Sequence, residues 1–209
     1  AETGAAVRDG KSGGHCSPFI SGNLRPFDPA MDRVAWEKQL DDERAIGFDL
    51  LWISHITPAF TKPLDEDPMR MVLDLCAERH MQVIVDTGGS PAWYGDLDLN
   101  KELGVIGANV KTIAERYGDH PAFFAWYVPH EIYMAWDAMG AYIQRLYPAV
   151  VDLCRKAVPG KPVTLSPFFI LDRDHVFGNF RFNEPDEYQT YWTDLIQRSG
   201  FDIIMLQDS

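Results

Sequence analysis

Short apolar runs alternate with amphipathic stretches along the whole chain. The apolar runs predict six strands, at residues 18–24, 48–56, 81–88, 123–132, 161–169 and 201–209. The stretches between them predict five helices, at residues 28–46, from 67, from 101, at 135–157 and at 185–199. The strands are apolar throughout, which is typical of a parallel sheet that is covered on both sides. The sequence therefore predicts an α/β protein.

Several single residues predict where the helices begin and end. Asp28 and Asp67 are each followed by a proline, a pair that is typical of a helix N-cap and first turn. Gly47 and Gly200 are expected to end the first and the last helix. Pro148 lies inside the fourth helix, and we expect it to kink that helix or to break it into two.

Two architectures fit this order of elements. An open doubly wound sheet usually carries a glycine-rich phosphate loop after its first strand, and the first turn, SGNLRPFD, has no such pattern. A TIM-type (β/α) barrel places its active site at the carboxyl ends of its strands. Polar or ionisable residues stand at these ends: Asn23, Arg25, His55, Asp86, His130, Glu131, Ser166, Gln207 and Asp208. We therefore predict a (β/α) barrel.

The predicted barrel is incomplete. A full barrel has eight strands and about 250 residues, whereas this chain has 209 residues and six predicted strands. A six-stranded barrel with an open seam would expose two sheet edges, which proteins avoid. We expect residues 15–209 to form one barrel domain, truncated at its carboxyl end, and residues 1–14, rich in glycine and charge, to form a flexible lead-in.

The charge and the apolar content limit the possible partners. A hydrophobic fraction of 46% is enough for one substantial core. The formal net charge of -12 argues against nucleic acid and anionic lipid as partners. The apolar runs are far shorter than the roughly 20 residues of a membrane helix, so we expect no membrane insertion.

Cysteines and motifs add little chemistry. Cys16, Cys76 and Cys154 are far apart, and the last two fall at helical core positions, which favours buried free thiols. No cofactor is expected, and the oligomeric state is left open. The small residues that begin the chain resemble the product of signal-peptide cleavage, so a secreted or periplasmic protein is expected.

Glu131 is the strongest candidate for a catalytic residue. It follows the apolar strand FFAWYV and has aromatic neighbours in Tyr127, Tyr133 and Trp136. Such surroundings raise the pKa of a carboxyl group and suit a general acid. The alternative is a carboxylate that caps the next helix. His130 beside it could orient the acid, bind a sugar hydroxyl, or be a structural histidine.

The other strand ends offer further candidates with open alternatives. Asp86 could contact substrate or cap the loop before Thr-Gly-Gly. His55 has a similar position, and Asn23 ends the first strand, so both are assigned to substrate binding. Gln207 and Asp208 end the sixth strand, where Asp208 could be a second catalytic carboxylate.

Aromatic residues near the same edge indicate a carbohydrate ligand. Flat aromatic faces beside carboxylates and amides suit pyranose rings, which stack their C–H faces and form hydrogen bonds at their edges. Trp93, expected to be the best exposed platform, is one of four candidates, with Tyr94, Tyr133 and Phe168. Trp126, in mid-strand, is expected to be core. The sequence has no HExxH or G-x-S-x-G motif, and no fixed ligand spacing supports a metal site.

Three motifs carry a resemblance to a known family. WYVPHEI, VTLSPFF and DIIMLQDS, in this order and spacing, resemble an uncharacterised bacterial domain-of-unknown-function family in the glycosidase superfamily of TIM barrels. The resemblance covers about residues 20–208. The chain departs from that family at Ser209, where the family has glycine, and from the related enzymes at His130, where they have asparagine.

The resemblance implies roles for matching positions. Glu131 matches the strand-four acid/base of related retaining glycosidases, and Gln207 and Asp208 match the strand-six signature. The nucleophile of those enzymes lies on strand seven, which this sequence does not contain. The second carboxylate must then come from Asp86, from Asp208 or from beyond the chain.

We therefore predict a glycoside-hydrolase-like barrel that acts on a poly- or oligosaccharide, with Glu131 as general acid/base. Two alternatives stay open at this point. One is a carbohydrate-binding module without catalytic activity, and the other is a metal-dependent barrel hydrolase or isomerase.

Overall fold

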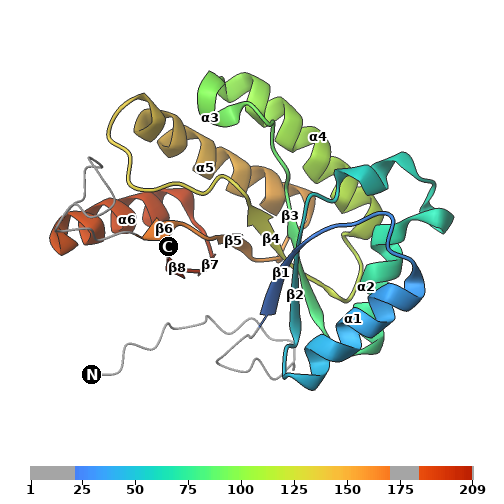
Figure 1. The fold of residues 1–209 in the computed structure, drawn as a ribbon. Coiled ribbons are helices and arrows are strands. Elements are labelled where there is room, and N and C mark those ends of the chain that lie inside the picture. The colour runs from blue at the N-terminus through green and yellow to red at the C-terminus, as the bar shows by residue number, and fades with distance from the viewer. Residues whose placement is uncertain (1–21, 170–183, 209) are drawn as a thin grey trace.

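The computed structural model describes residues 22–169 and 184–208 of the chain. Parallel strands alternate with helices throughout, as the sequence predicted (Figure 1). The expected lead-in at residues 1–14 and the thiol of Cys16 lie outside the described residues. No helix in the described ranges is long and apolar enough to cross a membrane.

One sheet of six parallel strands organises the molecule. Its order follows the sequence, β1-β2-β3-β4-β5-β7, so each strand pairs with the next one along the chain. The strands are β1 (Gly22–Pro26), β2 (Leu50–Ser54), β3 (Gln82–Asp86), β4 (Phe123–Val128), β5 (Val163–Leu165) and β7 (Ile203–Ile204). Within the described ranges β1 and β7 are the two edges of this sheet, so the sheet is open there.

The last two predicted strands are each split into two short pieces. β5 is followed by β6 (Phe168–Phe169) and β7 by β8 (Gln207–Asp208), and β6 and β8 form a separate parallel pair. Pro167 separates β5 from β6, and a proline has no N–H to donate to a sheet. The break therefore has a cause in the sequence, although the apolar pattern alone predicted continuous strands.

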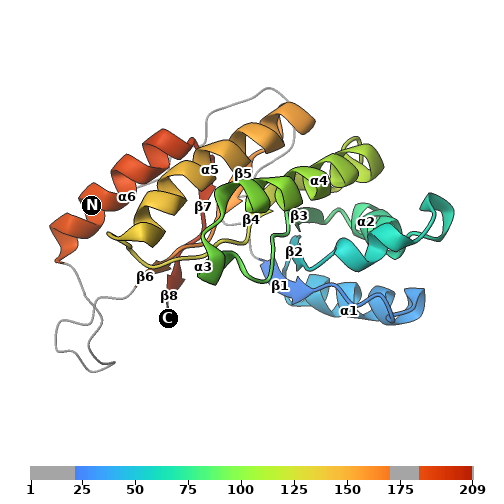
Figure 2. The same cartoon turned by 90° about the horizontal axis from the view of Figure 1, so that it is seen from above.

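The helices lie along one side of the sheet. Figure 2 shows that α6, α5, α4, α2 and α1 follow one another in an arc beside the strands. The main helices are α1 (Arg33–Ala45), α2 (Pro68–Glu78), α4 (Leu99–Tyr117), α5 (Ala138–Ala157) and α6 (Pro185–Ser199). Shorter turns follow β2 and β3, namely η1 (Thr57–Thr61), η2 (Leu64–Glu66) and α3 (Trp93–Asp96).

The helix starts and ends were predicted correctly at Asp67, at Gly200 and at Gly47, which follows the C-cap of α1 with a φ angle of 98°, and wrongly at Asp28. α1 begins after Asp32, because Asp28 instead caps a turn, where it accepts a hydrogen bond from the N–H of Ala30 at 2.8 Å. α5 runs through Pro148 as one helix, so the predicted break is absent. Asp67 caps α2 and Gly200 ends α6, as predicted.

The sheet has a core on each face. The larger core lies between strands and helices and contains Trp126, which was predicted to be core, and the free thiols of Cys76 and Cys154. The smaller core lies on the opposite face and contains Leu50, Ile84, Ala125 and Tyr127, against which the indole of Trp52 packs. Tyr127 and Trp52 meet edge to face, with ring centroids 4.4 Å apart.

Candidate active site

Glu131 lies three residues beyond the carboxyl end of β4. Its side chain is half-buried, and it accepts a hydrogen bond from the hydroxyl of Tyr127. Burial raises the pKa of the Glu131 carboxyl above its ordinary value, and a hydrogen bond with the side chain of Gln207 opposes this effect in part. Glu131 does not cap the next helix, because Asp137 is the N-cap of α5. The geometry therefore suits a proton donor.

Gln207 connects Glu131 to the separate two-stranded ladder of β6 and β8. Its side-chain amide also donates to the carbonyl oxygen of Ser166, at 2.8 Å. Gln207 pairs with Phe168 and Asp208 with Phe169 in the short β6–β8 ladder. Gln207 thus reaches the candidate acid, whereas the side chain of Asp208 lies outside the described residues, as does that of Asn23 in β1.

Asp86 has a different environment at the end of β3. Its two carboxylate oxygens accept hydrogen bonds from the backbone N–H groups of His55, at 3.0 Å, and of Gly88. Burial raises the pKa of the Asp86 carboxyl, and these two hydrogen bonds act in the opposite direction. The structure therefore gives Asp86 the loop-capping geometry that was one of its two predicted roles.

His55 is exposed, and its backbone is strained. Its φ angle is 59°, a left-handed conformation that residues with a side chain adopt at a cost of about 1–3 kcal/mol. Its Nδ1 atom lies 3.0 Å from the hydroxyl of Ser54. The bond from its N–H to Asp86 holds this conformation, so the ends of β2 and β3 are fixed to each other.

His130 lies two residues beyond the carboxyl end of β4, and its side chain is fully buried. Its Nε2 atom is 2.7 Å from Oε1 of Glu102, whose side chain is also buried. The Nδ1 atom of His130 has no hydrogen-bond partner among the described residues, but the ring is buried, so a sugar could reach this atom only if the surrounding packing opened. Glu102 was not predicted from the sequence. Its spacing could have indicated that it is buried, because it stands four residues before Ile106, on the face of α4 that carries the buried residues.

The aromatic candidates fall into two groups on either side of β4. Tyr133 is exposed and stacks on Phe168, with ring centroids 4.8 Å apart. Tyr94 is 68% exposed, whereas Trp93 is half-buried and packs on the ring of His130 at 4.8 Å. The expectation that Trp93 is the best exposed platform was therefore wrong, because its ring covers the buried histidine.

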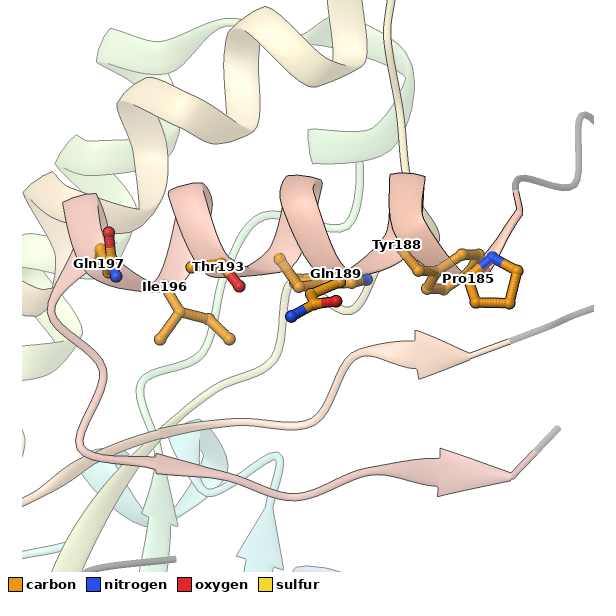
Figure 3. Close-up of a pocket in the computed structure, with 7 residues that line it drawn as sticks. Pro185, Tyr188, Gln189, Thr193, Ile196 and Gln197 are labelled. Atoms are coloured by element: carbon orange, nitrogen blue, oxygen red, sulfur yellow. The ribbon is translucent and has the colours of Figure 1, made fainter. Parts of the chain in front are cut away.

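Other parts of the described chain offer less. Residues 22–169 and 184–208 contain no group of three or more His, Cys, Asp or Glu side chains that could hold a metal ion. A hollow of about 690 Å³ runs along α6 (Figure 3). Its lining comes from this one helix and contains no ionisable carboxylate, lysine, arginine or histidine: Pro185, Tyr188, Gln189, Trp192, Thr193, Ile196 and Gln197.

Three solved structures of carbohydrate enzymes share this fold. A candidate alpha-L-fucosidase from Bacteroides thetaiotaomicron has a TM-score of 0.71 at 18% identity, over 91% of this chain and 64% of that one. A beta-galactosidase from Halorubrum lacusprofundi has a TM-score of 0.63 at 12% identity, over 90% and 40%. An endo-beta-1,4-mannanase from Thermotoga petrophila has a TM-score of 0.57 at 11% identity, over 70% and 42%.

These similarities establish the fold of TIM-barrel glycosidases for the six parallel strands and their helices. This chain spans less than two thirds of the length of each of the three proteins. A comparison with curated protein sequences finds no match.

The sequence also matches a protein family, over residues 24–209. The family is described as a domain of unknown function, DUF4434. The match includes β2 to β8 and all five main helices, and so contains Glu131 and its surroundings. The chain therefore belongs to the DUF4434 family, and its fold is that of the glycoside-hydrolase TIM barrels.

Proposed function

We propose that this domain hydrolyses glycosidic bonds in a poly- or oligosaccharide, with Glu131 as the general acid/base. The observation that carries the proposal is the environment of Glu131 at the carboxyl end of β4. Its carboxyl is half-buried, its pKa is raised by burial, and it contacts the side chains of Tyr127 and Gln207. A raised pKa keeps the proton on a carboxylic acid at higher pH, where it can be given to the leaving-group oxygen.

The hydroxyl of Tyr127 and the amide of Gln207 limit the directions in which the Glu131 carboxyl can point. A proton donor must lie within hydrogen-bond reach of the atom that it protonates, so a fixed direction favours transfer. Exposed Tyr94 and Tyr133 supply faces on which sugar rings could stack. Phe168 stacks on Tyr133 and supports it. Trp93 and the exposed residue His55 complete the proposed sugar-binding surface.

Glycoside hydrolysis needs a second carboxylate, about 5–5.5 Å from the first for retention of configuration or about 6.5–9.5 Å for inversion. Asp208 is our candidate within this chain, because it ends β8, which lies beyond the carboxyl end of β7. Asp86 is a weaker candidate, since both of its oxygens already accept backbone hydrogen bonds.

Both oxygens of Asp86 are occupied by backbone hydrogen bonds, and this favours a second function, carbohydrate binding without hydrolysis. If neither Asp208 nor another carboxylate lies opposite Glu131, the aromatic and amide groups at this edge can still hold a glycan. Release of reducing ends over time from a panel of polysaccharides separates the two functions, because a binding module retains the glycan and forms no product.

The first prediction concerns the activity of Glu131→Gln. Glutamine keeps the shape of the side chain but cannot donate a proton as a carboxylic acid does. We expect hydrolysis of the best polysaccharide of the panel to fall by about 10²–10⁴-fold, with the circular dichroism spectrum unchanged. Glu115→Gln, an exposed position on α4, is the matched control and should keep full activity. Unchanged turnover in Glu131→Gln contradicts the proposal.

The second prediction concerns stability and pH. A carboxyl whose pKa is raised on folding destabilises the folded state once the pH exceeds its folded pKa, because the charged form is then buried in part. Below the pKa of the unfolded chain, about 4.3, both states are protonated and the penalty disappears. Glu131→Gln should therefore be more stable than wild type at neutral pH and equal to it in acid.

Urea unfolding at several pH values measures this difference in free energy. The account is contradicted if Glu131→Gln loses the same stability at every pH, since that result would indicate a purely packing role.

The third prediction compares Asp208→Asn with Asp86→Asn. If Asp208 is the second carboxylate, Asp208→Asn should lower hydrolysis by at least about 100-fold without changing the free energy of unfolding. Asp86→Asn should instead lower that free energy by about 1–3 kcal/mol when it is measured in acid, where the wild-type carboxyl is also uncharged, because one backbone N–H loses its acceptor. The opposite pattern in the two variants would assign the catalytic role to Asp86.

A further inference from the structure

The residue before Glu131 belongs to a buried, hydrogen-bonded pair of side chains, Glu102 and His130. Glu102 belongs to the first turn of α4, yet its side chain is only 1% exposed, and that of His130 is fully buried. The Oε1 atom of Glu102 lies 2.7 Å from Nε2 of His130 and accepts a hydrogen bond from the N–H of Ser90 at 2.9 Å. One carboxylate oxygen therefore connects α4, the loop after β3 and the residue that precedes Glu131.

The peptide between His130 and Glu131 is held on its other side by α5. The hydroxyl of Tyr147 donates to the carbonyl oxygen of His130 at 2.6 Å. This carbonyl belongs to the same planar peptide as the N–H of Glu131. Glu102 fixes the side chain of His130 and Tyr147 fixes its carbonyl, so together they limit how the backbone can present Glu131.

The loop after β3 closes tightly on the pair. A Cβ atom on Gly89 would lie 2.7 Å from Oε1 of Glu102 and 2.9 Å from Cε1 of His130, and both distances are too short for real contacts. The ring of Trp93 covers His130 from the same loop, at 4.8 Å between centroids. The pair is thus packed on the loop side without room for a side chain at position 89.

Stability alone does not explain such a pair. Burying a carboxylate such as that of Glu102 costs several kcal/mol, and well-packed apolar residues in the place of such a pair are often as stabilising or more so. Burial would by itself raise the pKa of Glu102, but the hydrogen bonds from His130 and Ser90 outweigh it, and that pKa is lowered. Glu102 is thus a carboxylate suited to hold an N–H group in a fixed place.

We infer that Glu102 is a positioning residue for Glu131, acting through His130 and the peptide that follows it. This inference rests on the proposed role of Glu131 as acid and names a residue that acts on it without contacting the sugar. The direction of Glu131 is then set by α4 as well as by β4.

Glu102→Leu tests the inference, because leucine fills the space and removes the acceptor. We measure kcat and KM on the 4-nitrophenyl glycoside that wild type cleaves fastest, and titrate the Glu131 carboxyl by ¹³C NMR. We expect kcat to fall by about 10–100-fold with KM nearly unchanged, as for a displacement of about 1 Å at the acid. The pKa of Glu131 should move toward the ordinary value of about 4.3, since a loosened carboxyl gains water.

Two further variants keep the test independent of folding problems. Glu102→Gln retains one acceptor oxygen and should restore part of the lost kcat, whereas Tyr147→Phe releases the His130 carbonyl and should act in the same direction as Glu102→Leu. The inference is overturned if kcat per folded molecule and the pKa of Glu131 stay at wild-type values while only the free energy of unfolding falls.

The two proposals can fail separately. If wild type cleaves none of the glycosides, the hydrolase proposal fails on this panel, and the Glu131 titration still decides whether Glu102 positions that carboxyl. If wild type is active and the three variants match it in kcat and in the Glu131 titration, only the positioning role is wrong. Glu115→Gln, with its carboxylate 3.8 Å from Lys111 at the surface of α4, should change neither measurement.

Discussion

The parallel pairing of the strands is the constraint on which the rest of the structure depends. Each strand is joined to its neighbour through a crossover on the helix side, so the carboxyl ends of β2, β3 and β4 all meet at one edge. Hydrogen bonds then hold the loops together there, such as the bond that the backbone N–H of His55 donates to the carboxylate of Asp86. The edge is rigid because the sheet beneath it is packed on both faces.

Two carboxylates at this edge differ in what surrounds them. Both are partly or fully removed from water, and burial raises the pKa of each. Asp86 uses its oxygens to accept backbone N–H groups, so it serves the loops. Glu131 contacts side chains, those of Tyr127 and Gln207, and remains half-buried at the edge. This contrast is the physical basis for assigning acid chemistry to Glu131 and a structural role to Asp86.

The sequence pattern predicted the fold well, since buried parallel strands and amphipathic helices each have a clear period. Local capping chemistry located Asp67, but Asp28 and Asp32 carry the same side chain, and only the packing of the chain decides between them. The position of Glu131 followed from strand order. The support of Glu131 by Glu102 could not be predicted from the sequence. The contact between Glu102 and His130 joins residues 28 positions apart and depends on the depth at which α4 packs.

The dependence of catalysis on the leaving group tests most directly whether Glu131 donates a proton. Glu131→Ala should cleave a 2,4-dinitrophenyl glycoside with nearly the wild-type kcat/KM, because that leaving group departs without protonation and kcat/KM reports the step in which it departs. The same variant should lose activity on the parent glycan by about 10²–10⁴-fold. An equal loss on both substrates, or no loss on either, would contradict the assignment of Glu131 as the acid.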